Sequence, residues 1–189
     1  MPLAAMATGE RILAAAAEMT AESGWSGVTM AAVAERVGVS RQTVYNEWGS
    51  RDRLAEAMVL RELGAFLDEV DAGFDAHPGD LQAGVADAIA RVLDLARVNP
   101  LLRAIVTATH GAETELVPLL TTRADVVIAV ASERVRDRLV AYPGVRRSDV
   151  GVTVDLLVRT VLSHVMQPSA DSADVPDALA GAVARLLSD

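Results

Sequence analysis

Residues 29–54, T-M-A-A-V-A-E-R-V-G-V-S-R-Q-T-V-Y-N-E-W-G-S-R-D-R-L, hold the pattern that decides the fold. Two short helices are predicted in this stretch, from residue 30 to 37 and from residue 41 to about 48. Thr29 and Ser40 suit the N-cap positions, because their hydroxyls accept hydrogen bonds from a first helical turn. Gly38 and Gly49 suit the ends, because glycine adopts left-handed backbone conformations easily. Two short helices with this spacing are typical of a helix-turn-helix.

The second helix of the pair has one apolar and one polar face. Val44 and Trp48 lie four residues apart and are expected to face inward. The outward face is polar and consists of Arg41, Gln42, Thr43, Tyr45 and Asn46. Arginine reads guanine, asparagine and glutamine read adenine, and hydroxyls bind phosphate oxygens. Arg51 and Arg53 follow at the start of the next helix, whose free amides also suit a phosphate.

This segment resembles the DNA-binding domain of the TetR family of one-component regulators. The resemblance covers roughly residues 10–58 and rests on R-I-L-A-A-A, A-E-S-G-W, V-T-M-A-A-V-A-E-R-V-G-V-S and T-V-Y-N-E-W-G-S-R-D-R-L. Trp48 stands where the family usually has Phe, and Arg51 where it usually has Lys. The resemblance implies a transcriptional repressor. Together with the residue chemistry it predicts DNA contacts by Thr29, Ser40, Arg41, Gln42, Thr43, Tyr45, Asn46, Arg51 and Arg53.

Helical patterns extend through the whole chain, and no strand-like alternation occurs. We expect an all-α protein of about nine helices, with a helix-turn-helix domain over 1–55 and a ligand-binding and dimerisation domain over 56–189. Hydrophobic residues make up 51% and aromatic residues 3%, so the core must consist of Ala, Val and Leu. Beyond the motif, the predicted helices cover residues 9–23, 51–75, 81–98, 100–109, 113–141, 149–167 and 175–188.

The charge of the chain is uneven. The net charge is −9, which argues against a general binder of polyanions, and every basic residue is arginine. Residues 36–53 nevertheless hold four arginines against two acidic residues. The only basic island therefore coincides with the predicted DNA-reading segment.

The last two predicted helices favour a homodimer. The helix over 149–167 is apolar nearly all round, so it must be buried on more than one side. A partner subunit can provide the second side, and the last helix adds a further apolar seam. The alternative is that both helices form only intramolecular core. The resemblance also implies a dimer through these helices, and a twofold dimer reads a palindromic operator in double-stranded DNA.

The middle helices are the predicted location of a ligand pocket. The candidate lining is mostly apolar, which favours a small, apolar, lipid-like ligand. It comprises Phe66, Phe74, Leu102, Ile105, Val106, Thr107, His110, Leu116, Leu120, Val127, Arg159, His164 and Met166. Two of the polar residues have a simpler explanation than ligand contact. His110 precedes a helix-breaking glycine and can be a helix-end residue, and Arg159 can pair with Asp155. The motif variants resemble actinobacterial members of the family that are linked to alkane or fatty-acid metabolism.

Other functions find little support in the sequence. There is no cysteine, and His77, His110 and His164 lack metal-ligand spacing, so we expect no metal, no cofactor and no catalytic residues. No export signal or membrane-spanning run appears, which favours a cytoplasmic protein with no membrane partner. The alternative function is a helical lipid-binding protein with a vestigial DNA-binding head.

Overall fold

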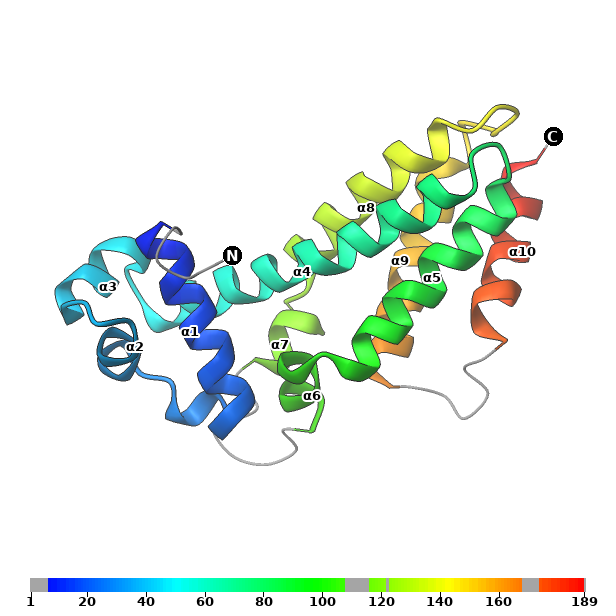
Figure 1. Ribbon diagram of the computed structural model, residues 1–189. Helices are drawn as coiled ribbons and strands as arrows, with labels where there is room; N and C mark the ends of the chain where they lie inside the picture. The colour runs from blue at the N-terminus through cyan, green and yellow to red at the C-terminus, as the bar shows by residue number, and fades with distance from the viewer. Residues whose placement is uncertain (1–6, 108–115, 122, 168–173, 189) are drawn as a thin grey trace. The chain divides into compact units, whose positions relative to one another are not determined.

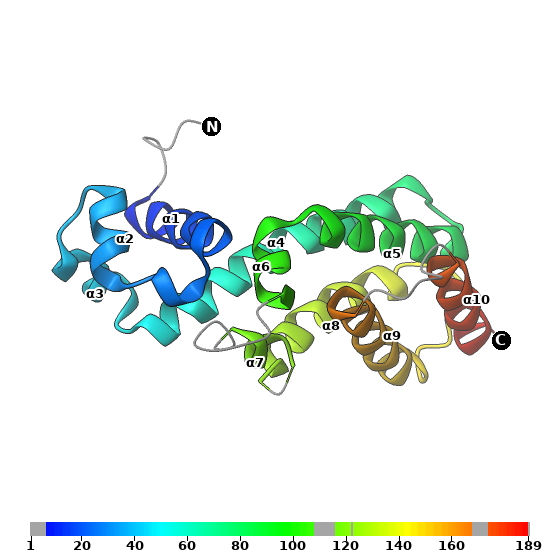
Figure 2. The ribbon, with the colours of Figure 1, turned by 90° about the horizontal axis from the view of Figure 1, so that it is seen from below.

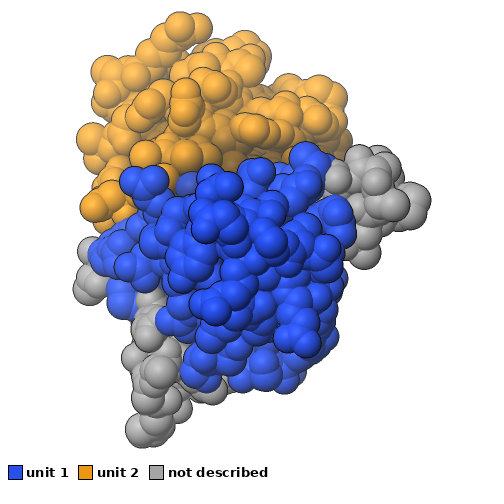
Figure 3. All heavy atoms as spheres, turned by 90° about the vertical axis from the view of Figure 1, so that its left-hand side faces the viewer, with its two compact units in different colours: residues 1–63, 99–123 blue, residues 64–98, 124–189 orange. Residues whose placement is uncertain are grey.

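The computed structural model describes residues 7–107, 116–121, 123–167 and 174–188 (Figure 1 and Figure 2). Every regular element in these residues is a helix, which confirms the all-α prediction. The chain divides into two compact units, residues 1–63 with 99–123 and residues 64–98 with 124–189, coloured separately in Figure 3. The predicted DNA-binding segment, 1–55, lies entirely in the first unit.

The first unit is built around a three-helix head. The elements of this unit are α1 (Thr8–Ser23), the short 3-10 helix η2 (Trp25–Gly27), α2 (Met30–Val37), α3 (Arg41–Trp48), the start of α4 (Arg51–Ala76), α6 (Pro100–Thr107) and α7 (Val117–Leu120). The head consists of α1, α2 and α3, and α1 packs on α2, on α3 and also on α6, which comes later in the chain. The most deeply buried side chains of this unit include Ile12, Val28, Val33, Val44, Leu54, Met58 and Leu116.

The second unit is a helical bundle. It comprises the remainder of α4, then α5 (Leu81–Val98), α8 (Asp125–Val140), α9 (Val150–Met166) and α10 (Val175–Leu187). Helix α5 packs on α9 and α10, and α9 also packs on α8 and α10. The Tyr142 hydroxyl donates to the carbonyl oxygens of Phe74 and His77, at 3.2 and 2.9 Å, and so ties the end of α8 to the end of α4.

One predicted helix is wrong. The helix expected over 113–141 is two helices in the described residues, α7 and α8. The amides of Thr121 and Arg123 both donate to the Pro118 carbonyl, at 3.2 and 2.7 Å, and this closes a turn. The Thr121 hydroxyl also donates to the Val117 carbonyl at 3.0 Å, an alternative to continuing the helix. Asp125 then opens α8.

The remaining described helix ends agree with the predictions to within a residue or two, and α2 and α3 have the predicted bounds. The predicted end of the helix that begins at Pro100 lies outside the described residues. Among the described helices, none combines the length and the hydropathy needed to cross a membrane.

Candidate nucleic-acid interface

Side-chain caps and glycines define the two helices of the motif. The Thr29 hydroxyl accepts a hydrogen bond from the Ala32 amide at 3.1 Å, and the Ser40 hydroxyl accepts one from the Thr43 amide at 3.0 Å. Gly38 ends α2 with φ +77°, a left-handed conformation that residues with a side chain rarely adopt. The turn from α2 to α3 is therefore fixed locally, and it sets the direction of α3.

Helix α3 has one fully buried side chain, two half-buried ones (Thr43 and Trp48) and an exposed polar face. Val44 is buried at 0% exposure, whereas Arg41, Gln42, Tyr45 and Asn46 are exposed. The Gln42 side-chain amide donates to Oδ1 of Asn46 at 2.8 Å, so these two side chains are ordered side by side. The structure thus brings the predicted base-reading residues onto one exposed face.

The arginines of the basic island differ in their partners. Arg36 pairs with Glu22 at 2.7 Å, and its hydrogen bond and charge lower the pKa of the Glu22 carboxyl. Arg41 and Arg53 are exposed and form no ion pair with any residue that the structure describes. In the basic island, these two guanidinium groups therefore carry exposed positive charge that no described carboxylate neutralises.

Arg51 lies differently. Its guanidinium faces the loop before α2, where it donates to the carbonyl oxygens of Val28 and Trp25 at 2.7 and 2.6 Å. The guanidinium carbon lies 4.5 Å from the centroid of the Trp25 ring. The resemblance placed Arg51 among the DNA contacts, and nothing in the sequence pointed to these intramolecular partners.

Two further features of the head were not predicted. Arg11 of α1 donates to the Val37 carbonyl at 2.7 Å and so satisfies the last turn of α2. Trp48, which was expected to face inward, is half-buried, and its buried indole N–H has no hydrogen-bond partner among the described residues. The Phe that the family usually carries at this position has no such donor. The replacement of Phe by Trp was therefore the sequence feature that could have indicated an unpaired N–H here.

The predicted ligand-lining residues are distributed over both units. The first unit buries Leu102, Ile105, Leu116 and Leu120 and half-buries Val106. The second unit buries Phe74 and Val127 and half-buries Phe66, His164 and Met166. Thr107 is the last residue of α6, and His110 lies outside the described residues. Arg159 is exposed and donates to Asp155 at 2.9 Å, which is the ion pair expected as the alternative to ligand contact.

The capped α2–turn–α3 unit with an exposed polar face defines a helix-turn-helix DNA-binding protein. Residues 12–58 match the family model of bacterial regulatory proteins of the tetR family, and residues 80–185 match the C-terminal domain of the bacterial tetracycline repressor. The HTH-type transcriptional regulator AlkX of Mycobacterium tuberculosis is 30% identical over 95% of this chain and 82% of its own. The chain belongs to the TetR family of transcriptional regulators.

Solved structures agree with this assignment. The repressor AlkX from a Dietzia strain, implicated in biodegradation of n-alkanes, superposes with a TM-score of 0.78 and 27% identity, over 95% of this chain and 94% of that one. RolR, solved in complex with resorcinol, has a TM-score of 0.68 at 16% identity, over 95% of this chain and 87% of that one, and supports the fold alone. Among the described residues, no group of His, Asp or Glu side chains is placed to hold a metal ion.

Proposed function

We propose that this regulator is a ligand-responsive repressor, which binds a palindromic operator as a homodimer and is released by a small apolar ligand. The observation that carries the proposal is the polar face of α3. Its side chains, Arg41, Gln42, Tyr45 and Asn46, are exposed and are not part of the core. A head that no longer bound DNA would not need to keep these residues on its surface. Their presence therefore disfavours the lipid-binding alternative. A regulator of chromosomal genes acts in the cytoplasm.

The side chains divide into base readers and phosphate contacts. Arg41 offers a bidentate donor to guanine. The bond between Gln42 and Asn46 leaves the Gln42 oxygen as an acceptor and the Asn46 amide as a donor, and an adenine edge needs this combination. The remaining residues contact the phosphate backbone of the DNA and so position the protein on it. They are Thr29, Ser40, Thr43, Tyr45 and Arg53.

The proposed dimer interface lies on the last two helices. Val152 and Leu156 are 68% and 54% exposed on one side of α9, and Leu186 of α10 is 47% exposed. The opposite side of α9 is buried in the core of its own unit through Val154, Leu157 and Val158. A second copy that covers the exposed side removes this apolar area from water and stabilises the dimer.

The ligand class rests on the chemistry of the predicted pocket and on the relatives. The predicted lining is apolar apart from Thr107, His110, Arg159 and His164. The Dietzia relative is implicated in n-alkane biodegradation, and this favours an alkane or a fatty-acid derivative for this chain as well. Ligand and operator then oppose each other by linkage, each weakening the other by the same factor.

The decisive experiment is operator selection from random and genomic DNA, followed by gel shifts at two salt concentrations with alkanes, fatty acids and acyl thioesters. We expect specific, salt-sensitive binding that one ligand class releases. Asn46→Ala is expected to weaken operator binding by about 1–3 kcal/mol but random DNA hardly at all, whereas Tyr45→Phe weakens both alike. A folded dimer that selects no sequence contradicts the proposal and supports the lipid-binding alternative.

The dimer interface has its own test. Leu156→Glu places a charge in the proposed interface, and light scattering after gel filtration is expected to report a monomer. Val126→Glu is the matched control, because Val126 is 56% exposed on α8, outside the proposed interface. Equal dissociation by both variants, or by neither, contradicts an interface on α9 and α10.

A further inference from the structure

Arg51 is the first residue of α4, yet its charged group points back toward the chain that leads into α2. Its guanidinium donates from Nε to the Val28 carbonyl and from Nη2 to the Trp25 carbonyl, and it covers the Trp25 ring. Both acceptor residues are buried, Trp25 at 2% exposure and Val28 at 0%. The three contacts form one clamp, which we define as Arg51 with Trp25 and Val28.

The clamp holds the start of α2, and the position of α2 determines the position of the recognition helix, α3. Val28 directly precedes Thr29, the N-cap of α2, and α2 packs on α3. The far end of α2 is held by Arg11 through the Val37 carbonyl. Arginines from α4 and α1 therefore fix the two ends of α2, and α3 takes its position from α2.

We infer that Arg51 is a positioning residue and not a phosphate ligand. It fixes the position of the recognition helix, α3, relative to the first turn of α4. The inference rests on the proposed operator binding. A displacement of the first turn of α4 either breaks the clamp or carries the start of α2 with it, so operator affinity depends on where α4 begins.

The chemistry of the clamp requires a guanidinium. Arginine is planar, has several fixed donors and stacks on aromatic rings, whereas the lysine ammonium is a compact point charge. A lysine at position 51 cannot bond both carbonyls in this geometry and cover the ring at the same time. A phosphate contact makes no such demand, because either cation neutralises a phosphate. Arg51→Lys therefore separates the two roles.

The first test measures operator affinity over a series of salt concentrations. We expect Arg51→Lys and Arg51→Met to lose on the order of tenfold in operator affinity, the effect of about 1.4 kcal/mol, and to keep the slope of log K against log salt. Arg53→Met is the matched phosphate variant, and it is expected to reduce that slope by about 0.9. Binding to random DNA is expected to fall in Arg53→Met and to stay unchanged in the Arg51 variants.

Two results overturn the inference. One is wild-type operator affinity in Arg51→Lys. The other is a slope reduced by about 0.9 in Arg51→Met, because this is the signature of a lost phosphate contact. If Arg51→Lys unfolds the head, as circular dichroism and proteolysis report, the result supports the clamp, since exchanging one cation for another at a phosphate contact leaves the fold intact.

A second test needs no DNA. In a Trp48→Phe background Trp25 is the single tryptophan, and loss of the guanidinium over its ring is expected to shift its emission and to increase quenching by acrylamide. Arg53→Met in the same background is the control and leaves Trp25 unchanged. Unchanged Trp25 fluorescence in Arg51→Lys and Arg51→Met contradicts the clamp. If the wild-type protein selects no operator, the proposed function fails, but this measurement still decides the clamp.

Discussion

The motif helices and the late helices of the second unit are ordered in different ways. Helices α2 and α3 have eight residues each, and each begins with a hydroxyl that accepts a hydrogen bond from its first turn. Helices α8, α9 and α10 have 16, 17 and 13 residues, and none of the three has a side-chain cap. They share instead a continuous apolar core with α4 and α5.

This difference follows from the cost of starting a helix. An isolated helix of eight residues is unstable in water, because its first turn orders several residues for one hydrogen bond. A cap offsets part of that cost locally, by about 1 kcal/mol. A longer helix with an apolar side is stabilised by burial at many positions, and it tolerates an uncapped end. We therefore expect the second unit to be sensitive to packing and the head to be sensitive to single polar groups.

The largest effect is expected from Gly73→Ala. A Cβ atom at Gly73 would lie 2.4 Å from the backbone of Ala88, so α4 and α5 would have to separate. Overpacking against backbone costs about 3 kcal/mol at the upper end of its usual range. Urea unfolding, followed by helical circular dichroism, measures the loss.

Gly64 provides the control within the same helix. No atom lies within 4 Å of a Cβ at Gly64, and alanine is the better helix former by about 0.5–1 kcal/mol. Gly64→Ala is therefore expected to leave the stability unchanged or to raise it. Equal losses in the two variants contradict the importance of the close approach at Gly73.

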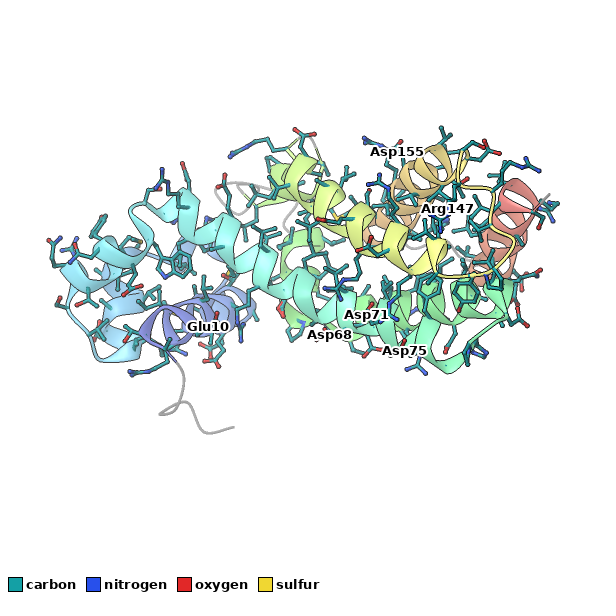
Figure 4. All side chains as sticks on the ribbon, turned by 90° about the horizontal axis from the view of Figure 1, so that it is seen from above. Glu10, Asp68, Asp71, Asp75, Arg147 and Asp155 are labelled. Atoms are coloured by element: carbon teal, nitrogen blue, oxygen red, sulfur yellow. The ribbon has the colours of Figure 1, made fainter. Side chains whose placement is uncertain are left out.

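The next effect concerns Asp71, a half-buried carboxylate of α4 (Figure 4). It pairs with Arg134 and, at 2.7 Å, with Nε of Arg138. Partial burial acts to raise the pKa of Asp71, but the hydrogen bonds and charges of the two arginines outweigh it, so the pKa lies below its ordinary 3.8. A lowered folded-state pKa means that the stabilisation is complete above the unfolded-state pKa and is lost as the pH falls through the folded value.

Asp71→Asn is thus expected to cost about 2 kcal/mol at pH 7, because it leaves two arginines with a weaker acceptor. It is also expected to flatten the loss of stability below about pH 4. Unfolding measured from pH 7 to pH 2 tests both effects. Asp155→Asn is the control, since its pair with Arg159 is exposed and contributes little. If both variants show the same acid profile, the assignment to Asp71 is wrong.

The same contrast explains what the sequence could predict. The ends of α2 and α3 are encoded by Thr29, Gly38, Ser40 and Gly49, residues whose effect is local, and the predicted bounds were confirmed. The break between α7 and α8 depends on two amides that share the Pro118 carbonyl, and apolar spacing alone does not reveal such a turn. The Arg51 contacts join residues 23 and 26 positions apart, and no periodicity records them. The DNA-binding and ligand-binding residues stay predictions until binding is measured.

A smaller effect is expected from Thr29→Ala in the head. The substitution leaves the Ala32 amide without its acceptor and should cost about 1 kcal/mol of stability. Thr29→Ser keeps the acceptor and is expected to behave like the wild type. Hydrogen exchange of the α2 amides measures the effect where it arises. Equal exchange in Thr29→Ala and the wild type contradicts a head that depends on its caps.

The smallest effect is expected from Trp48→Phe, although the substitution changes a large aromatic side chain that is half-buried in the head. The indole N–H of Trp48 is buried without an acceptor among the described residues, and an unsatisfied buried donor costs about 1–3 kcal/mol. Phenylalanine removes that cost but also some apolar contact area, so we expect a net change within about 0.5 kcal/mol. Trp25→Phe is the matched comparison, since Trp25 is 2% exposed and its ring is covered by Arg51. It should be clearly destabilising. A loss of equal size at the two tryptophans in urea unfolding means that the head depends on packing as the second unit does, and the contrast between the two regions then fails at this position.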